Sequence, residues 1–243
     1  MTPPSPDQIM AAALRGDAPG QALLSERADG HISTADLAWW LRDPQAEPPV
    51  DLAALDLIDD GHSLDVGCAT GRHLDTIRQR GLTGEGIDTC AHAIALARAN
   101  GHTCHHADIW HYQPARPYDT VLALGGNLGI AGYLARLGPF LGRMCDLLTP
   151  TGSLIVTSVD WRHTTQTNPH HAAHAARKRA AGRYPGEVEL RLRLGEQASS
   201  WFPWVWIDPD TLTETAARLG LYPATTLSWG PKYALQLRRK TPR

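Results

Sequence analysis

The sequence lacks a basic surplus and long apolar runs, and each absence disfavours a class of partner. Its 23 Lys and Arg stand against 25 Asp and Glu, a formal net charge of -2. Proteins that bind nucleic acid by neutralising phosphates usually carry more positive charge, so we expect no nucleic-acid partner. No apolar stretch approaches the ~18 residues that cross a bilayer, so we expect no membrane partner either.

Paired cysteines and an export signal are also missing. The four cysteines form no C-x-x-C pair: Cys68, Cys90, Cys104 and Cys145. Such scattered cysteines are typical of reduced thiols. The first ten residues hold three prolines and lack the basic-then-apolar pattern of a signal peptide. Together these features predict a cytoplasmic protein.

Strands and helices alternate regularly between residues 61 and 159. Short apolar strands are expected at 63–66, 84–87, 102–107, 118–124 and 153–158, with helices between them. This rhythm predicts a parallel sheet with helices on both of its faces. Two further strands, at 222–228 and 233–238, follow a helix expected at 208–219.

The two flanking regions differ from this pattern. Residues 1–60 are expected to be helical, with segments at 7–15 and 51–58 and a helix opened by Ser33 and Asp36 as a capping box. That last helix would place Leu37, Trp40 and Leu41 on one face. Residues 187–194 alternate strictly between apolar and charged, and 199–207 follow a Gly195 turn, which predicts a β-hairpin with one buried face.

The most informative segment is L-D-V-G-C-A-T-G-R-H-L, residues 64–74. An apolar strand leads into a glycine turn, and a helix opens beyond it. Gly67 and Gly71 allow a ligand to approach the backbone, and the amides at the helix start favour a polar or anionic group. Asp88 follows about 20 positions after the first glycine, the spacing of a ribose-binding acid.

Acidic side chains at the strand ends indicate which ligand this turn accepts. Asp88 can accept both ribose hydroxyls, and Asp108 can accept from an adenine amine beside Ile109 or Trp110. Asp108 can equally be a helix cap, and this alternative stays open. With Asp65, three acids surround the turn, which suits a positively charged ligand better than a pyrophosphate.

A nicotinamide dehydrogenase is the nearest competing interpretation. Its G-x-G-x-x-G fingerprint requires glycine where Ala69 stands and a small residue where Arg72 stands. Neither is present. A βα connection that binds no ligand is the remaining alternative for this turn.

With these motifs in order, segment 61–160 resembles a class I S-adenosylmethionine-dependent methyltransferase. The matching motifs are the first glycine motif at 64–71, the ribose acid Asp88, the adenine segment 107–110, the fourth strand at 118–124 and the run before the fifth strand at 147–154. The family usually has glycine at Ala69, where alanine is commonly accepted.

The resemblance implies an α/β fold: a doubly wound, seven-stranded, mostly parallel sheet (Rossmann-like) with an N-terminal helical cap and a β-hairpin lid. It divides the chain into a cap at 1–60 and a methyltransferase domain at 61–243, with the lid insertion at 160–207. The implied cofactor is S-adenosyl-L-methionine. The residues implied to bind it are Asp65, Gly67, Cys68, Ala69, Gly71, His73, Asp88, Thr89, Ala107, Asp108, Ile109, Leu124 and Gly125.

The methyl acceptor is expected near the loop 125–129, after the fourth strand. Asn127 offers both a hydrogen-bond donor and an acceptor, although it can instead only support the turn. The family's N-P-P-Y tetrad, typical of nucleobase or amide methylation, is absent. We therefore expect a small-molecule acceptor, clamped by Trp40 and by the hairpin aromatics, of which Trp204 is the chosen candidate.

The histidines of residues 160–186 have two possible roles. His163 follows the fifth strand and is a candidate general base. His170 and His174 are spaced i, i+4, as on a metal-binding helix, but no Cys, Asp or Glu follows Asp160 in this segment. A solvated helix is favoured there, and no metal is expected.

The sequence thus predicts a methyltransferase for a small molecule of bacterial specialised metabolism, with Asn127 and His163 as catalytic residues. Trp40, Asn127 and Trp204 would bind the acceptor, and the protein would be a monomer or homodimer. Two alternatives stay open. One is a methyltransferase for RNA or protein, and the other is an intramolecular cyclisation of the same cofactor.

Overall fold

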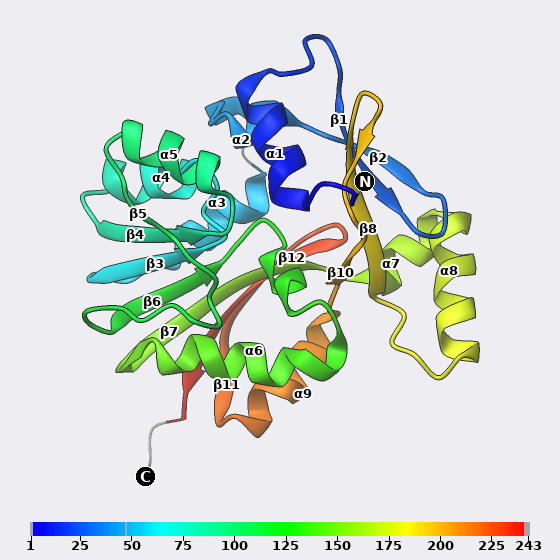
Figure 1. Ribbon diagram of the computed structural model, residues 1–243. Helices are drawn as coiled ribbons and strands as arrows, with labels where there is room; N and C mark the ends of the chain where they lie inside the picture. Colours follow the sequence, from blue (N-terminus) through cyan, green and yellow to red (C-terminus); the bar gives the residue numbers. More distant parts are fainter. Residues whose placement is uncertain (1, 47, 241–243) are drawn as a thin grey trace.

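The computed structural model describes residues 2–46 and 48–240, which build two β-sheets lying side by side (Figure 1). The larger sheet has seven strands: β3 (His62–Val66), β4 (Thr83–Asp88), β5 (Thr103–His106), β6 (Tyr118–Ala123), β7 (Leu148–Val159), β11 (Leu221–Trp229) and β12 (Lys232–Arg239). Their order is β11-β12-β7-β6-β3-β4-β5. Strands β3 to β7 pair in parallel, while β12 is antiparallel to both of its neighbours.

Helices cover both faces of this sheet, because its central strands have apolar side chains on both faces. Every residue of β3 is buried, which is typical of a strand between two helical layers. One layer holds α3 (Pro49–Leu55), α4 (Arg72–Gln79) and α5 (Ala91–Ala99), and the other holds α6 (Leu134–Asp146) and α9 (Pro209–Arg218) (Figure 1). The expected doubly wound, seven-stranded α/β fold is confirmed.

The smaller sheet has five strands and is antiparallel. It consists of β1 (Leu23–Arg27), β2 (Ile32–Ala35), β8 (Glu187–Leu194), β9 (Gln197–Ala198) and β10 (Phe202–Val205). The order is β10-β8-β1-β2, with β9 paired to β8. The predicted hairpin at 187–207 is confirmed, since Trp204 pairs with Val188 across it. Its partner strand β1 comes from the other end of the chain.

The expected helix opened by Ser33 and Asp36 is wrong. Residues Ile32–Ala35 form β2 instead, and only Leu37–Trp40 is helical (α2). The cap is Asp36, whose side chain accepts from the Ala38 amide 3.0 Å away. Pairing with β1 uses the backbone groups before Asp36 and prevents an earlier helix start. Residues 1–60 therefore contain a β-hairpin as well as helices, and their boundary as a separate cap stays a prediction.

Helix α1 (Pro6–Arg15) begins and ends with well-known signals. Ser5 and Gln8 form a reciprocal capping box, and Gly16 ends the helix in the left-handed conformation. Its buried face, which includes Ile9 and Ala13, packs on Leu23 and Leu194 of the smaller sheet. This packing holds α1 across the space between the two sheets (Figure 1).

Three shorter helical elements complete the description. Residues Pro44–Ala46 and Asn127–Ala131 form 3-10 helices η1 and η2, and α7 (Trp161–Thr167) precedes the predicted helix α8 (Pro169–Ala180). The polar composition of 160–167 gave no signal for α7. Among the helices described, none has the length and apolarity needed to cross a bilayer.

Candidate functional site

A cavity of about 500 Å³ lies between the two sheets. The larger sheet contributes the carboxyl ends of β3, β4 and β5, through Val66, Gly67, Asp88 and Ala107. Residues of α1, of β1 and of the hairpin β8–β10 form the other side. Ligands bind at such strand ends in open α/β sheets, so this cavity is the candidate site.

The glycine turn after β3 has the left-handed backbone that its sequence indicates. Gly67, Ala69 and Gly71 have φ angles of 76°, 47° and 89°. Ala69 holds this conformation at a cost of roughly 1–2 kcal/mol. Its amide donates to Asp88 Oδ2 over 2.9 Å. Ala69 and Gly67 line the cavity, whereas Gly71 begins α4 outside it.

Asp88 at the end of β4 is the best-positioned acid of the cavity. Besides Ala69, the Cys90 amide donates to its other oxygen over 2.8 Å. A carboxylate has about four acceptor sites, so two remain for a ligand. Burial raises the pKa of Asp88, and the two amides oppose that rise. The neighbouring Thr89 also lines the cavity.

Asp65, His73 and Cys68 lie behind the glycine turn rather than in the cavity lining. Asp65 is fully buried, and its Oδ2 lies 3.0 Å from His73 Nδ1. Cys68 is also buried, with its sulfur 4.0 Å from that of Cys104. Leu124 and Gly125 are likewise absent from the lining. These five predicted binding residues are placed to support the turn and the loop after β6.

Asp108 lines the cavity with Ala107 and Ile109. Its Oδ1 accepts from the Trp110 amide over 3.0 Å, as in the alternative in which it caps a turn. The other oxygen remains exposed to a ligand. The Asp108 side chain therefore caps a turn through one oxygen and offers the other to a ligand, so both roles that the sequence left open fit the structure.

Asn127 stands where the two sheets approach each other. Its Nδ2 donates to the carbonyls of Val66 and Gly67, at 2.9 and 3.1 Å. Because both neighbours are carbonyls, the amide nitrogen must be on this side. Within the described part of the chain Oδ1 makes no hydrogen bond, and the residue lines the cavity. Asn127 thus supports the turn and also presents an acceptor.

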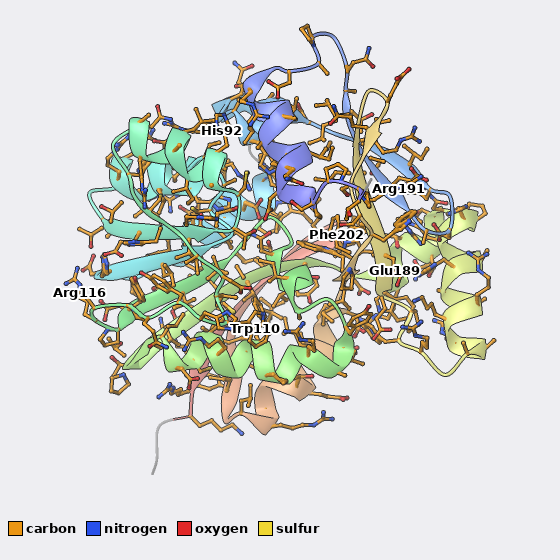
Figure 2. All side chains as sticks on the ribbon, viewed as in Figure 1. His92, Trp110, Arg116, Glu189, Arg191 and Phe202 are labelled. Carbon is orange, nitrogen blue, oxygen red and sulfur yellow. The ribbon has the colours of Figure 1, made fainter. Side chains whose placement is uncertain are left out.

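Apolar and aromatic side chains line the cavity where the smaller sheet covers it. They are Trp40, Ile130, Leu190, Leu192, Phe202 and Trp204. The indole of Trp204 packs so closely on Gly129 that any Cβ there would clash with it. Phe202 lies toward the middle of the molecule, whereas Arg116 lies at the outer end of the parallel sheet (Figure 2). Trp201, which precedes Phe202 in the sequence, does not line the cavity and is 42% exposed.

His163 is not brought to the cavity. It is an exposed residue of α7 and is not among the lining residues. His174 and His170 instead contact Asp29, at 2.9 and 3.2 Å, from the turn between β1 and β2. The structure therefore supplies an acid that the sequence segment itself lacks. Among the described residues, no group of three or more His, Cys, Asp or Glu is arranged to hold a metal ion.

Several residues of the site gave no signal in the sequence. Asp7 and Met10 of α1 and Ser25 of β1 line the cavity, because α1 packs over α5 and β1 joins the hairpin. Asp7 Oδ1 accepts from Thr89 Oγ1 over 3.2 Å. The i, i+3 spacing of Asp7 and Met10 marks one face of a helix but not what that face contacts.

Asp51 of α3 fixes the loop after β6 from outside the cavity. Its Oδ1 accepts from the Gly125 amide and from Thr157 Oγ1, at 3.1 and 3.2 Å. Its Oδ2 lies 3.6 Å from Arg72, whose guanidinium stacks on Trp39. A buried carboxylate with these partners determines the position from which Asn127 extends.

Comparisons with known proteins agree on this architecture. Residues 37–222 match a family described as a methyltransferase domain. A curated relative, dTDP-3-amino-3,6-dideoxy-alpha-D-glucopyranose N,N-dimethyltransferase of Streptomyces fradiae, is 27% identical over 164 residues. That match covers 65% of this chain and 63% of the relative, so it spans less than two thirds of the relative's length.

Two solved structures share the fold. An S-adenosylmethionine-dependent methyltransferase of Bacteroides fragilis, in complex with S-adenosyl-L-homocysteine, has a TM-score of 0.78 at 21% identity and covers 97% of this chain and 94% of its own. An amino pentose methyltransferase of Micromonospora echinaspora, bound to S-adenosylmethionine, has a TM-score of 0.55 at 18% identity, covering 84% and 97%. At these identities the likeness establishes the fold alone.

Proposed function

This chain belongs to the methyltransferase-domain family, and from that premise we propose that it transfers a methyl group from S-adenosyl-L-methionine to a small-molecule acceptor. The observation that carries the proposal is Asp88 at the end of β4, in the same cavity as Asn127 and Trp204. One side of this cavity offers acceptors for a nucleoside, and the other offers apolar surface.

The residues at the strand ends fit this cofactor. Asp88 keeps acceptor sites for the two hydroxyls of a ribose, and the free oxygen of Asp108 suits an adenine amine beside Ile109. When bound, the cofactor supplies an electrophilic methyl group on a positively charged sulfur. The carboxylates favour such a ligand over a dinucleotide, whose pyrophosphate they would repel.

The protein's own contribution to the transfer is positioning. Asn127 Oδ1 can accept a hydrogen bond from the acceptor, while Trp40 and Trp204 hold its apolar body. Fixing two reactants in line supplies a large part of the acceleration in such displacements. We assign no general base, because His163 lies on α7 outside the cavity lining.

A small acceptor agrees with the cavity's volume of about 500 Å³, since an RNA or protein substrate needs a larger open cleft. The name of the Streptomyces fradiae relative, an amino-sugar dimethyltransferase, also supports an acceptor of bacterial specialised metabolism. No described feature favours cyclisation of the cofactor.

Calorimetric titration with S-adenosyl-L-homocysteine tests the proposal, with NAD as the control ligand. We expect micromolar binding of the former and none of the latter. Binding of NAD alone, or of neither ligand, would overturn it. Product analysis separates the cyclisation alternative, which releases methylthioadenosine in place of S-adenosyl-L-homocysteine.

A further inference from the structure

Resting on the proposed function, we infer that the acceptor is an apolar amine that carries no phosphate or carboxylate. The inference goes beyond the fold because it depends on the charges and aromatic rings of this chain's own cavity, and on the lack of His, Lys or Tyr among its described lining residues. It also differs from what the Streptomyces fradiae relative suggests, since that protein's name describes a nucleotide-linked sugar.

The charge of the cavity disfavours an anionic acceptor. Three carboxylates line it, those of Asp7, Asp88 and Asp108, and none of its described lining residues is Lys, Arg or His. A nucleoside diphosphate carries two negative charges, which proteins usually meet with Arg, Lys or a helix N-terminus. Beside Asp7 such a group would be repelled, and the low polarity of the walls strengthens that repulsion.

Basic side chains do occur in this region of the molecule, but they line another cavity. Arg27, Arg177 and Lys178 border a space of about 280 Å³ next to α8. That space shares no lining residue with the cavity at the strand ends. The cations that a phosphorylated acceptor needs are therefore directed away from the proposed transfer site.

The aromatic surface favours a compact apolar group with a positive charge. Trp40, Phe202 and Trp204 line the acceptor side together with Leu190 and Leu192. Aromatic faces attract ammonium groups by about 0.5–2 kcal/mol, more when water is excluded. The carboxylates on the opposite side of the cavity also attract a positively charged acceptor.

The weakness of the bases in the cavity favours nitrogen over oxygen as the nucleophile, since the lining carboxylates cannot readily deprotonate an alcohol. An alcohol must lose its proton to become reactive, and no described His, Lys or Tyr lines the cavity. Burial raises the pKa of the Cys90 thiol, which keeps it protonated. An amine bound as its ammonium ion must first pass a proton to water or to a lining carboxylate, but it does so with a pKa of about 10, whereas an alcohol loses its proton far less readily.

Asn127 Oδ1 supplies the direction for that lone pair. By accepting an N–H of the amine, it turns the lone pair toward the methyl group. The nitrogen lone pair forms the N–C bond as the S–C bond breaks and its electrons remain on sulfur, which becomes a neutral thioether. The methylated ammonium then releases a proton to water.

Four probe ligands test the inference. Three are similar in size and differ in charge: 2-phenylethylamine, 2-phenylethanol and 3-phenylpropanoate. The fourth, UDP-glucose, carries a diphosphate. Each is titrated calorimetrically into protein saturated with S-adenosyl-L-homocysteine. We expect the amine to bind about tenfold or more tightly than the propanoate and UDP-glucose. With S-adenosyl-L-methionine supplied, the amine and not the alcohol should gain one methyl group by mass spectrometry.

Equal or tighter binding of UDP-glucose or the propanoate would overturn the inference. So would methylation of the alcohol, or failure of the amine to bind at millimolar concentration. Failure of S-adenosyl-L-homocysteine to bind would instead refute the proposed function, and the two failures are therefore distinguishable.

Adjacent aromatic residues provide a matched pair of variants. Phe202 lines the cavity, whereas Trp201 faces outward with the Arg191 guanidinium 4.6 Å from its ring. We expect Phe202→Ala to weaken amine binding about five- to tenfold and Trp201→Ala to leave it unchanged. Affinity for S-adenosyl-L-homocysteine should persist in both. Equal losses of amine affinity in the two variants would contradict an amine seated against Phe202.

Discussion

The two sheets of this protein are built in different ways, although both border one cavity. Strands β3 to β7 of the larger sheet follow one another along the chain, and the cavity-lining residues of this sheet lie at or after the ends of β3, β4, β5 and β6. The smaller sheet joins segments from opposite ends: Glu26 of β1 binds Arg191 of β8, 165 positions later. A local motif therefore describes the first sheet, and no local motif can describe the second.

This difference separates two kinds of specificity. The strand ends that we assign to the cofactor belong to the scaffold that a whole family shares. The side of the cavity that we assign to the acceptor depends on how α1, β1 and the hairpin β8–β10 pack together. Relatives can thus keep the first while changing the second, which is why a relative's substrate is weak evidence for this chain's substrate.

The largest effect is expected at Asp51, which holds the loop between the two sides. Asp51→Ala removes a buried acceptor from Gly125 and Thr157 and leaves Arg72 without that carboxylate. Breaking such a buried charge pair costs about 3–5 kcal/mol of unfolding free energy. Denaturant titration measures the loss. Asp51→Asn keeps the shape and should lose less. Equal losses would mean that the charge carries the whole effect, whereas an Asn variant as stable as the wild type would mean that the charge contributes nothing.

Asp88→Ala tests the cofactor side alone. Loss of charge-assisted hydrogen bonds should weaken S-adenosyl-L-homocysteine binding by ~1–3 kcal/mol. Amine binding at the other side should change much less if the two sides are independent. Calorimetry with each ligand separates these effects. Unchanged affinity for S-adenosyl-L-homocysteine would contradict the ribose assignment.

The raised pKa of Asp88 adds a pH dependence to the same measurement. Its carboxylate is the form that accepts from ribose hydroxyls, so affinity should fall as the pH falls through this pKa. Because burial raises it, the fall should begin at a less acidic pH than for an ordinary aspartate. Asp88→Asn should lack this acidic fall.

A pair of glycines tests the acceptor side. At Gly129 an added Cβ would clash with Trp204, whereas at Gly142 in α6 nothing lies within 4 Å of it. Gly129→Ala should cost about 1–3 kcal/mol of stability. Gly142→Ala should gain about 0.5–1 kcal/mol, since alanine favours a helix. Denaturant titration of both variants gives the comparison, and a neutral Gly129→Ala would show that the indole moves freely.

The smallest effect concerns the contact of α8 with the turn after β1. Burial lowers the pKa of His31, His171 and His174, and Arg27 lowers each further. A histidine with a lowered folded-state pKa stabilises fully above about pH 6.5 and loses that stability as the pH falls. The protection factors of the α8 amides, which correct for the slower intrinsic exchange at lower pH, should therefore fall between pH 7.5 and 5.5. Helix α6 contains no histidine and serves as the control.

Asp29 adds a further loss of stability, but only at stronger acidity. Burial opposes its ionisation, but the bond with His170 and the charge of Arg27 hold the pKa of Asp29 at about 2. Its contribution is present above pH 4 and is lost only as the pH falls toward 2. Protection factors in α8 that are unchanged at pH 5.5 would show that the histidines do not control this contact.

The sequence predicted the larger sheet well because its signals are contiguous. Gly67, Asp88 and Asp108 each lie at or just after the end of a strand, and parallel strands bring their carboxyl ends to one edge. The strand β2 was missed because Ser33 and Asp36 resemble a helix start as much as a strand end. Only pairing with β1, which the local pattern does not contain, decides between them.

The same reasoning separates the predicted site residues. Asn127 and Trp204 line the cavity because Asn127 begins the 3-10 helix after β6, which ends at Ala123, and Trp204 lies on the inner face of the hairpin. His163 follows β7 just as closely, but α7 turns it outward. A residue that follows a strand end is brought near the site, but the direction of its side chain depends on where the next helix begins.

The central position of β1 between β2 and β8 has a consequence for synthesis of the chain. A ribosome adds about 5–20 residues per second, so β1 emerges roughly 10–30 s before its partner β8. During this interval β1 has one exposed, unpaired edge, while β3 to β7 are completed in turn. During synthesis, the strand ends of β3 to β7 are therefore complete before the smaller sheet that lies over them.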